Sequence, residues 1–323
     1  MRLRINRFTP SRRDLIYSRG IRFSLVQPHF VVSGKSRCEE IDDMPGIYRQ
    51  SADVLLETIG RDMEMGLTAH MLFYVMEENL KDPKATNASI SDSPLNHAIR
   101  ELRKRHGSEI VIFSDVCLCT GTDHGHCGVI VGEKIDNDES VKELVRIAIS
   151  NAEAGVDYVS LSDMMDNRVN VVRNAFEERG FHETGILSYS VKYASSFYGP
   201  FRDAASSSPK FGDRKSHQMD IRSNYDEAIL EALQDEKEGA DIIMIKPGLP
   251  YLDVLKVVSD KVLRPVAVYN VSGEYSMVHK ISSDKKNRGQ MIIEILSSFA
   301  RSGADIIVTY HAREVFSEKL LGR

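Results

Sequence analysis

The sequence predicts an α/β fold, an eight-fold β/α (TIM) barrel preceded by an extended N-terminal arm. After about residue 24, short apolar runs alternate with amphipathic stretches along almost the whole chain. Strands that alternate with helices form a parallel sheet, and eight such strands close into a barrel. A doubly wound open sheet is the alternative, but no glycine-rich dinucleotide-binding turn follows the first expected strand.

Eight apolar runs have the length and composition of buried strands. They cover residues 25–32, 70–75, 110–116, 157–162, 186–191, 241–245, 266–271 and 305–310. Amphipathic segments between them predict helices, several of which end on a glycine, as helix C-termini prefer. These helices cover residues 51–66, 94–106, 140–155, 168–180, 224–239, 252–262 and 288–303. We therefore expect one catalytic domain, residues 25–323.

The first 24 residues form a basic segment without a clear amphipathic period. Its arginines are Arg2, Arg4, Arg7, Arg12, Arg13, Arg19 and Arg22. We expect an arm that contacts neighbouring subunits; a mitochondrial-type transit peptide, which is also arginine-rich, is the alternative.

The composition argues against two kinds of partner. The formal net charge of −5 disfavours a nucleic-acid-binding surface. No apolar run reaches the roughly 18 residues that a membrane-spanning helix needs. No export signal is visible near the N-terminus, so we expect a cytoplasmic protein whose thiols stay reduced.

Three of the four cysteines, Cys117, Cys119 and Cys127, lie within eleven residues at the end of an apolar run. Three thiolates that converge at a strand end can hold a soft metal and leave one coordination position open, as catalytic zinc requires. Two alternatives remain from the spacing alone. The cysteines are incidental buried thiols, or His124 or His126 completes a structural site.

Two lysines follow neighbouring expected strands. The two-residue period places Ser188, Ser190 and Lys192 on one face of the fifth strand, and Lys246 at the end of the sixth. Both lysines can then point into the mouth of the barrel. An amine in apolar surroundings near another cation loses proton affinity, and a neutral lysine attacks ketones to form Schiff bases. The alternative is that each lysine merely reaches solvent.

The connection after the fifth strand, residues 193–223, is unusually long and rich in glycine, serine, arginine and aromatic residues. Long loops inside a compact domain are commonly lids or binding loops. In a barrel this loop lies at the C-terminal face, where active sites are found. We expect it to be an active-site lid.

Ordered motifs along nearly the whole chain resemble those of the porphobilinogen synthase (5-aminolevulinate dehydratase) family. They include Met44-Pro-Gly-Ile-Tyr48, Asp115-Val-Cys-Leu-Cys119, His124-Gly-His-Cys-Gly128, Ser162-Asp-Met-Met-Asp166, Lys192-Tyr-Ala-Ser195, Lys210-Phe-Gly-Asp-Arg-Lys215, Gln218-Met-Asp220 and Val271-Ser-Gly-Glu-Tyr275.

This resemblance implies an asymmetric condensation of two 5-aminolevulinate molecules to porphobilinogen, with loss of two waters, in tetrapyrrole (heme) biosynthesis. Lys246 would form a Schiff base with the first molecule and Lys192 with the second. Asp115 stands where the family keeps a carboxylate near the second molecule. An iminium is an electron sink, so it acidifies the adjacent carbon for the new carbon–carbon bond.

The resemblance also assigns the substrate contacts. Arg202, Arg214 and Gln218 would hold the carboxylate of the second substrate, and guanidinium forks suit that role. Ser272 and Tyr310 would hold the carboxylate of the first, within an apolar wall. That wall consists of Tyr198, Phe201 and Tyr269.

Family members with all three cysteines use zinc, so the resemblance implies a zinc enzyme. It further implies a homo-octamer, with arms that wrap neighbouring subunits, and an allosteric magnesium ion at Glu227. Asp226 occupies a usual arginine position beside that glutamate. Two other departures are the loop at residues 120–123, beside the cysteines, and Asn167, where a glycine is common.

Two other functions remain possible explanations of the sequence. A simpler Schiff-base aldolase would use one lysine and leave the second, with both carboxylate sites, unexplained. A catalytically silent zinc-binding or assembly protein would not need either lysine.

Overall fold

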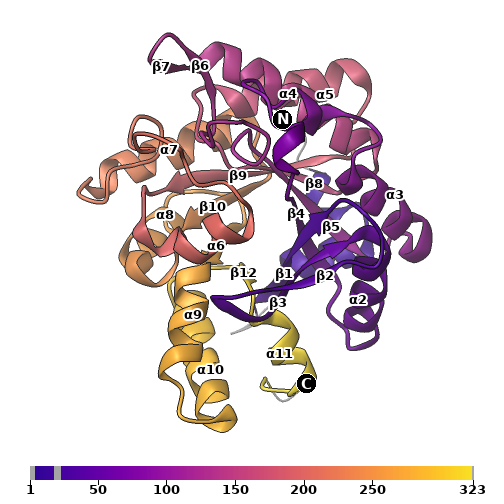
Figure 1. Cartoon of the computed structure of the whole chain (residues 1–323). Helices are drawn as coiled ribbons and strands as arrows, with labels where there is room; N and C mark the ends of the chain where they lie inside the picture. Colours follow the sequence, from indigo (N-terminus) through magenta and orange to yellow (C-terminus); the bar gives the residue numbers. More distant parts are fainter. Residues whose placement is uncertain (1–3, 18–22, 322–323) are drawn as a thin grey trace.

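The computed structural model describes residues 4–17 and 23–321, in which eight parallel strands form a closed barrel (Figure 1). In order around the barrel these strands are β1 (Ser24–Val32), β4 (Ala69–Tyr74), β5 (Val111–Val116), β8 (Tyr158–Leu161), β9 (Gly185–Lys192), β10 (Ile242–Lys246), β11 (Val266–Asn270) and β12 (Ile306–Thr309). The last strand pairs with the first, with Leu25 opposite Ile307. The predicted barrel is confirmed.

Helices surround the barrel on its outer side (Figure 1). The predicted ones are α2 (Ala52–Glu64), α3 (Pro94–His106), α4 (Asn137–Glu153), α5 (Arg168–Arg179), α7 (Tyr225–Glu238), α8 (Leu252–Ser259) and α10 (Lys285–Arg301). Further helical segments that the sequence did not predict are α1 (Pro10–Tyr17), α6 (Gly199–Ala204), α9 (Ser272–Ile281), α11 (Ala312–Ser317), and the short η1 (Ile5–Arg7), η2 (Glu78–Leu80), η3 (Thr86–Ser89), η4 (Ser196–Tyr198) and η5 (Leu249–Tyr251).

Two hairpins were also not predicted. Strands β2 (Cys38–Ile41) and β3 (Met44–Ser51) form an antiparallel pair that extends the sheet, because β3 runs parallel to the end of β1. Strands β6 (Val129–Val131) and β7 (Lys134–Asp136) form a separate hairpin after the cysteine loop.

Four barrel strands begin one residue later than predicted, and three of them, β8, β10 and β12, directly follow an aspartate. The aspartate before each of these three strands turns its carboxylate onto a backbone N–H of the neighbouring strand. Asp157 accepts from Ile112 at 2.8 Å, and Asp241 accepts from Ile186 at 2.9 Å. Asp305 accepts a third such bond, from the first residue of β11. These bonds fix the register at the N-terminal end of the barrel.

The described part of the N-terminal arm packs against the barrel of its own chain. Ile5 joins the apolar cluster inside the barrel, and Asn6 donates to the carbonyl oxygen of Asp241 at 3.0 Å. Arg12 pairs with Asp157 at 2.7 Å. Since both aspartates precede their strands, the arm covers the N-terminal end of the barrel.

Three of the arm's arginines, Arg2, Arg19 and Arg22, lie outside the described residues. The expected contact of the arm with a neighbouring subunit stays a prediction. Among the described helices, none is long and apolar enough to cross a membrane.

Candidate active site and metal centre

The two candidate lysines lie opposite each other on neighbouring strands. Lys192 ends β9, Lys246 ends β10, and the two are paired in the parallel ladder. Both side chains are buried, with 6% and 5% of their surface exposed. The prediction that both point into the mouth of the barrel is confirmed, because both line one cavity.

The predicted face of β9 is wrong for Ser188. Leu187 and Tyr189 belong to the cluster inside the barrel, whereas Ser188 donates outward to Asp235 of α7 at 2.6 Å. The pairing of β9 with β10 shifts by one residue. Ile243 pairs with Ser188 and Ile245 pairs with Val191, so β9 has one extra residue between these pairs. Such a bulge changes which face the later residues occupy. Lys192 therefore points inward because of the bulge and not because of strict alternation.

Lys246 sits in an aromatic cage. Its Nζ lies 4.1 Å from the ring centroid of Tyr269 and 5.0–5.4 Å from those of Tyr189, Phe201 and Tyr198. Ring faces attract a cation, but they stabilise an ammonium group less than water does, so the charged form of the lysine is disfavoured. Burial, reinforced by the nearby charge of Lys192, lowers the pKa of Lys246 to about 7.

Lys192 has a more polar environment. Its ammonium donates to the carbonyl oxygen of Ser162, and one ring, that of Tyr189, lies 5.5 Å from Nζ. Asp115, on β5, is partly buried, and its Oδ1 has no hydrogen-bond partner among the described residues. Burial raises the pKa of Asp115 to about 6, although Ser162 and both lysines oppose the shift. This carboxyl can therefore exchange a proton near neutral pH.

A small cavity at the mouth of the barrel joins most of the predicted groups. Its volume is about 20 Å³, room for about one water molecule. It is lined by Phe73, Asp115, Cys119, Ser162, Lys192, Tyr198, Phe201, Arg202, Arg214 and Lys246. The lysines, the carboxylate and one cysteine thus face the same space.

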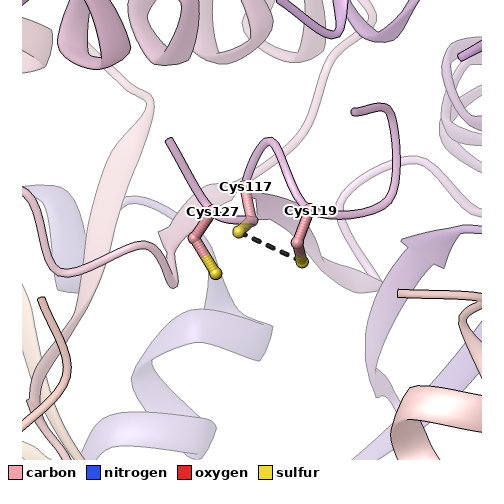
Figure 2. Close-up of side chains that lie close together, drawn as sticks. All are labelled: Cys117, Cys119 and Cys127. Atoms are coloured by element: carbon pink, nitrogen blue, oxygen red, sulfur yellow. Dashed lines mark hydrogen bonds between the residues drawn. The ribbon is translucent and has the colours of Figure 1, made fainter. Parts of the chain in front are cut away.

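The three cysteines lie close together, as Figure 2 shows. One of them, Cys119, also lines this cavity. The sulfur atoms of Cys117 and Cys119 are 3.3 Å apart, and all three sulfurs lie within 4.8 Å of one another. Zinc with tetrahedral bonds of about 2.3 Å would hold sulfurs about 3.8 Å apart. The donor set and its spacing therefore fit one zinc ion.

Neither nearby histidine completes this group. Within the described residues, no histidine or carboxylate joins the three sulfurs within the same distance. His126 Nε2 contacts the carbonyl oxygen of Phe211 at 2.9 Å, and His124 Nδ1 accepts from the backbone of His126. The arrangement favours three protein ligands with an open position over a closed structural site.

Hydrogen bonds among the three cysteines shift the pKa values of their thiols. The pKa of Cys127 lies well below its ordinary value, because the thiols of Cys117 and Cys119 hydrogen-bond to it and Arg214 lies nearby. The pKa of Cys117 is raised by its hydrogen bonds with Cys119 and Cys127 and by burial. The arrangement thus favours the thiolate at Cys127, and thiolate is the form that binds metal.

The lid residues that are expected to hold a substrate carboxylate have polar atoms without partners in the described part of the chain. Nε of Arg202 and of Arg214 is buried without a hydrogen-bond partner among the described residues, as are both amide atoms of Gln218. Arg214 is fixed by bonds from Nη2 to the carbonyl oxygens of Gly125 and Ser207. Both arginines line the cavity, but Gln218 instead borders a separate depression.

Ser272, Tyr269 and Tyr310 lie at the ends of β11 and β12, as predicted. The hydroxyl of Ser272 accepts from the backbone N–H of Phe201 at 2.9 Å and so joins α9 to the lid. The hydroxyls of Tyr269 and Tyr310 are 3.2 Å apart. Tyr269 therefore lies beside Lys246 and Tyr310 lies beside Tyr269, but Ser272, Tyr269 and Tyr310 do not line the small cavity.

Glu227 lies away from the lysines, exposed in the first turn of α7. It borders the same depression as Gln218, together with Glu231 and Asp166. Among the described residues, no group of three metal-ligating side chains forms around it. The magnesium site stays a prediction.

The departures from the family pattern are accommodated locally. Asn167 has a φ of 61°, in the left-handed region that glycine favours and that asparagine adopts more readily than most residues. In the loop 120–123, Thr122 donates to the carbonyl oxygen of His126 at 2.9 Å. The backbone of Asp82 bonds both Gly121 and Asp123 in the same loop. This altered loop is thereby fixed beside the cysteines.

Three residues of the site had no role assigned from the sequence. Ser162 holds Lys192 through a backbone carbonyl, and Tyr189 lies beneath both lysines. Glu274 accepts from the backbone of Gly248 at 3.0 Å and of Leu249 at 2.9 Å, so it fixes the turn after Lys246. Ser162 and Glu274 belong to two of the sequence motifs that resemble the family, so these motifs could have indicated a role for them.

Comparisons with known proteins show the family to which the chain belongs. The family model for delta-aminolevulinic acid dehydratase matches residues 1–318. The chain belongs to the delta-aminolevulinic acid dehydratase family. A delta-aminolevulinic acid dehydratase from Methanothermus sociabilis is 45% identical over 294 residues, which cover 91% of this chain and 90% of the relative. One from Bacillus subtilis is 43% identical over 290 residues, covering 90% and 88%.

A crystal structure of a family member supports the same assignment. The delta-aminolevulinic acid dehydratase of Toxoplasma gondii, in complex with the reaction product porphobilinogen, superposes with a TM-score of 0.89 at 40% identity. The match covers 98% of this chain and 91% of that chain. The expected family, fold and enzyme class are therefore confirmed for this dehydratase family member.

Proposed function

We propose that this enzyme condenses two 5-aminolevulinate molecules to porphobilinogen and releases two waters. The observation that carries the proposal is the pair of buried lysines, opposed at the ends of neighbouring strands in one cavity. A single-lysine aldolase would not need the second lysine. A silent zinc-binding protein would not need an amine whose pKa is lowered to about 7.

Lys246 begins the reaction with the first substrate. At neutral pH about half of this amine is unprotonated, given its pKa of about 7. The neutral amine attacks the ketone carbon, and the ketone oxygen leaves as the first water. The resulting iminium is an electron sink that activates its own carbon toward attack and acidifies the adjacent carbon. The new carbon–carbon bond forms between the acidified carbon of one substrate and the activated ketone carbon of the other.

Lys192 would bind the second substrate on the polar side of the cavity. Formation of this Schiff base expels the ketone oxygen as the second water. Both lysine–carbon bonds break again as the ring forms, because a substrate amino group displaces one lysine and the other lysine is eliminated as the free amine. Asp115, with its pKa raised to about 6, lies where it can take and return protons during these steps. The Ser162 carbonyl positions the Lys192 amine for attack.

The two substrate carboxylates would be held at opposite sides. Arg202 and Arg214 offer buried guanidinium donors to the second. Ser272 and Tyr310 would hold the first beside the aromatic cage.

The lid must open for substrate to enter. A cavity of about 20 Å³ is far smaller than two substrate molecules, so the described state is closed. Residues 193–223 close it through Arg202, Arg214 and Phe201. Opening of this segment would admit substrate, and its closure would exclude water from the iminium.

Cys117, Cys119 and Cys127 would hold zinc. When bound, zinc supplies Lewis acidity toward a substrate oxygen at its open position. We further propose a cytoplasmic homo-octamer with an allosteric magnesium ion at Glu227. Light scattering of active enzyme tests the assembly, and a monomer would contradict it.

The direct test measures porphobilinogen formation from 5-aminolevulinate before and after thorough removal of metal by a chelator. We expect activity that falls on the order of 10²–10³-fold, because a Lewis acid contributes several kcal/mol, and that returns with zinc. Activity unchanged by chelation would contradict the zinc proposal alone. Absence of porphobilinogen under all conditions would contradict the proposed reaction.

A further inference from the structure

A second cluster of metal-ligating side chains lies outside the active site, between α9 and α11. His279 belongs to the last turn of α9, His311 follows β12, and Glu314 belongs to the first turn of α11. One ligand atom from each lies within 4.8 Å of the other two. The proposed reaction uses none of them.

The histidines of this cluster have unused nitrogens. His311 is 1% exposed, and neither of its ring nitrogens has a hydrogen-bond partner among the described residues. Its Nδ1 lies 3.6 Å from Oε2 of Glu314, too far for a hydrogen bond. His279 Nε2 is also buried without a partner in the described part of the chain. Buried polar atoms without partners are unfavourable, and an ion between the two rings would give a partner to one nitrogen of each histidine.

The protonation states suit metal binding. Burial lowers the pKa of His279 to about 4 and also lowers that of His311, so both imidazoles are neutral at pH 7. Neutral imidazole is the form that binds metal. The pKa of Glu314 falls to about 2 despite its burial, because Arg288 donates a hydrogen bond to the carboxylate and carries a positive charge.

Arg288 orients the carboxylate. Its Nε donates to Oε1 of Glu314 at 2.8 Å, which leaves Oε2 directed at His311. Ligating carboxylates are commonly held in this way by a second partner. The positive charge of Arg288 opposes a nearby cation, so we expect weaker binding than at the cysteine cluster.

Another buried cluster, formed by His29, Asp62 and His70, differs from this one because its polar atoms already have partners. Arg313 occupies both oxygens of Asp62, at 2.7 and 2.8 Å. His29 Nε2 contacts His70 Nδ1 at 3.0 Å, and His70 Nε2 contacts a backbone carbonyl oxygen. Its polar atoms are already satisfied, so it offers no position for an ion.

We propose that His279, His311 and Glu314 bind a divalent transition-metal ion, with zinc the best match, at a site separate from the cysteine cluster. Two imidazole nitrogens and one carboxylate oxygen suit zinc and leave a position for water. The ion would connect α9 to α11. Because Tyr310 precedes His311 directly, this connection adjoins the residues around Lys246.

Metal analysis of the full-length protein tests the site. After equilibration with zinc and removal of the excess, we expect two zinc ions per wild-type chain and one in His279→Gln. A matched control, His97→Gln, changes an exposed histidine on α3 and should retain two. Equal zinc content in wild type and His279→Gln would overturn the proposal.

Cobalt gives a second readout that separates the two sites. In Cys119→Ser/Cys127→Ser, we expect cobalt to produce ligand-field absorption without thiolate charge transfer. Zinc should raise the Tm of this variant, because an ion that binds the folded state stabilises it. Both effects should vanish when His279→Gln is added. Persistence of both effects in the combined variant would also overturn the proposal.

Discussion

Lys246 and Lys192 face each other across neighbouring strands, but their surroundings differ. Four aromatic rings enclose Lys246, whereas Lys192 has one ring nearby and donates to the Ser162 carbonyl. Burial lowers the pKa of Lys246 to about 7. The difference indicates how one side-chain type can serve two roles, an amine ready to attack on the apolar side and an amine held in place on the polar side.

The largest expected effect is the loss of activity when either lysine is substituted, and the two substitutions should differ in the adduct that remains. Lys246→Met should reduce porphobilinogen formation on the order of 10⁴-fold or more, because a lost nucleophile has no substitute. Lys192→Met should lose the overall reaction but keep a borohydride-trappable adduct at Lys246. Mass spectrometry of peptides measures both. If Lys192→Met also abolishes the adduct at Lys246, the two roles are not separable.

The pH dependence of the first adduct sharpens the same comparison. Protonation of Lys246 below pH 7 removes the nucleophile, so the rate of trapping should fall toward tenfold per pH unit and level off above about pH 8. Asp115→Asn removes a negative charge that favours the ammonium, which should move the rise to lower pH. A rise that moves to higher pH would contradict this electrostatic account.

A smaller effect is expected at the second carboxylate site. Arg202→Gln should raise KM about 10–100-fold, because hydrogen bonds from charged groups contribute about 1.5–3 kcal/mol. Steady-state kinetics measure this change. Trapping at Lys246 should be nearly unchanged, since Arg202 would hold the other substrate. Loss of that adduct would show that the two sites are assigned the wrong way round.

The smallest effect is expected at the first carboxylate site. Tyr310→Phe removes one hydroxyl, whose neutral hydrogen bond contributes about 0.5–1.5 kcal/mol. The affinity for the first substrate, measured by the concentration dependence of trapping, should fall a few-fold. An unchanged affinity would place that carboxylate elsewhere.

The sequence predicted the elements whose signals are local. Helix α3 (Pro94–His106) matches at both ends, because Ser93 caps it by accepting from Asn96 at 3.2 Å and Gly107 follows in a positive-φ conformation. The cysteine spacing likewise predicted a cluster that the fold brings together.

Features that depend on contacts between strands were not predictable in this way. Strict alternation placed Ser188 and Lys192 on one face, but the bulge in β9 separates them. No pattern in β9 itself marks this extra residue. The Ser162 carbonyl is a backbone group, so its contact with Lys192 leaves no mark on residue type. Strand β3 was missed because Pro45 and Gly46 interrupt the alternation that indicates a strand. Strand β2 was missed because it is short and mostly exposed.

Borohydride trapping with wild-type enzyme tests the central claim most directly. At limiting 5-aminolevulinate, peptide mapping should find the reduced adduct on Lys246, and Lys192 should be modified when a second substrate molecule is available. No adduct at Lys246, or an adduct confined to Lys192, would contradict the account.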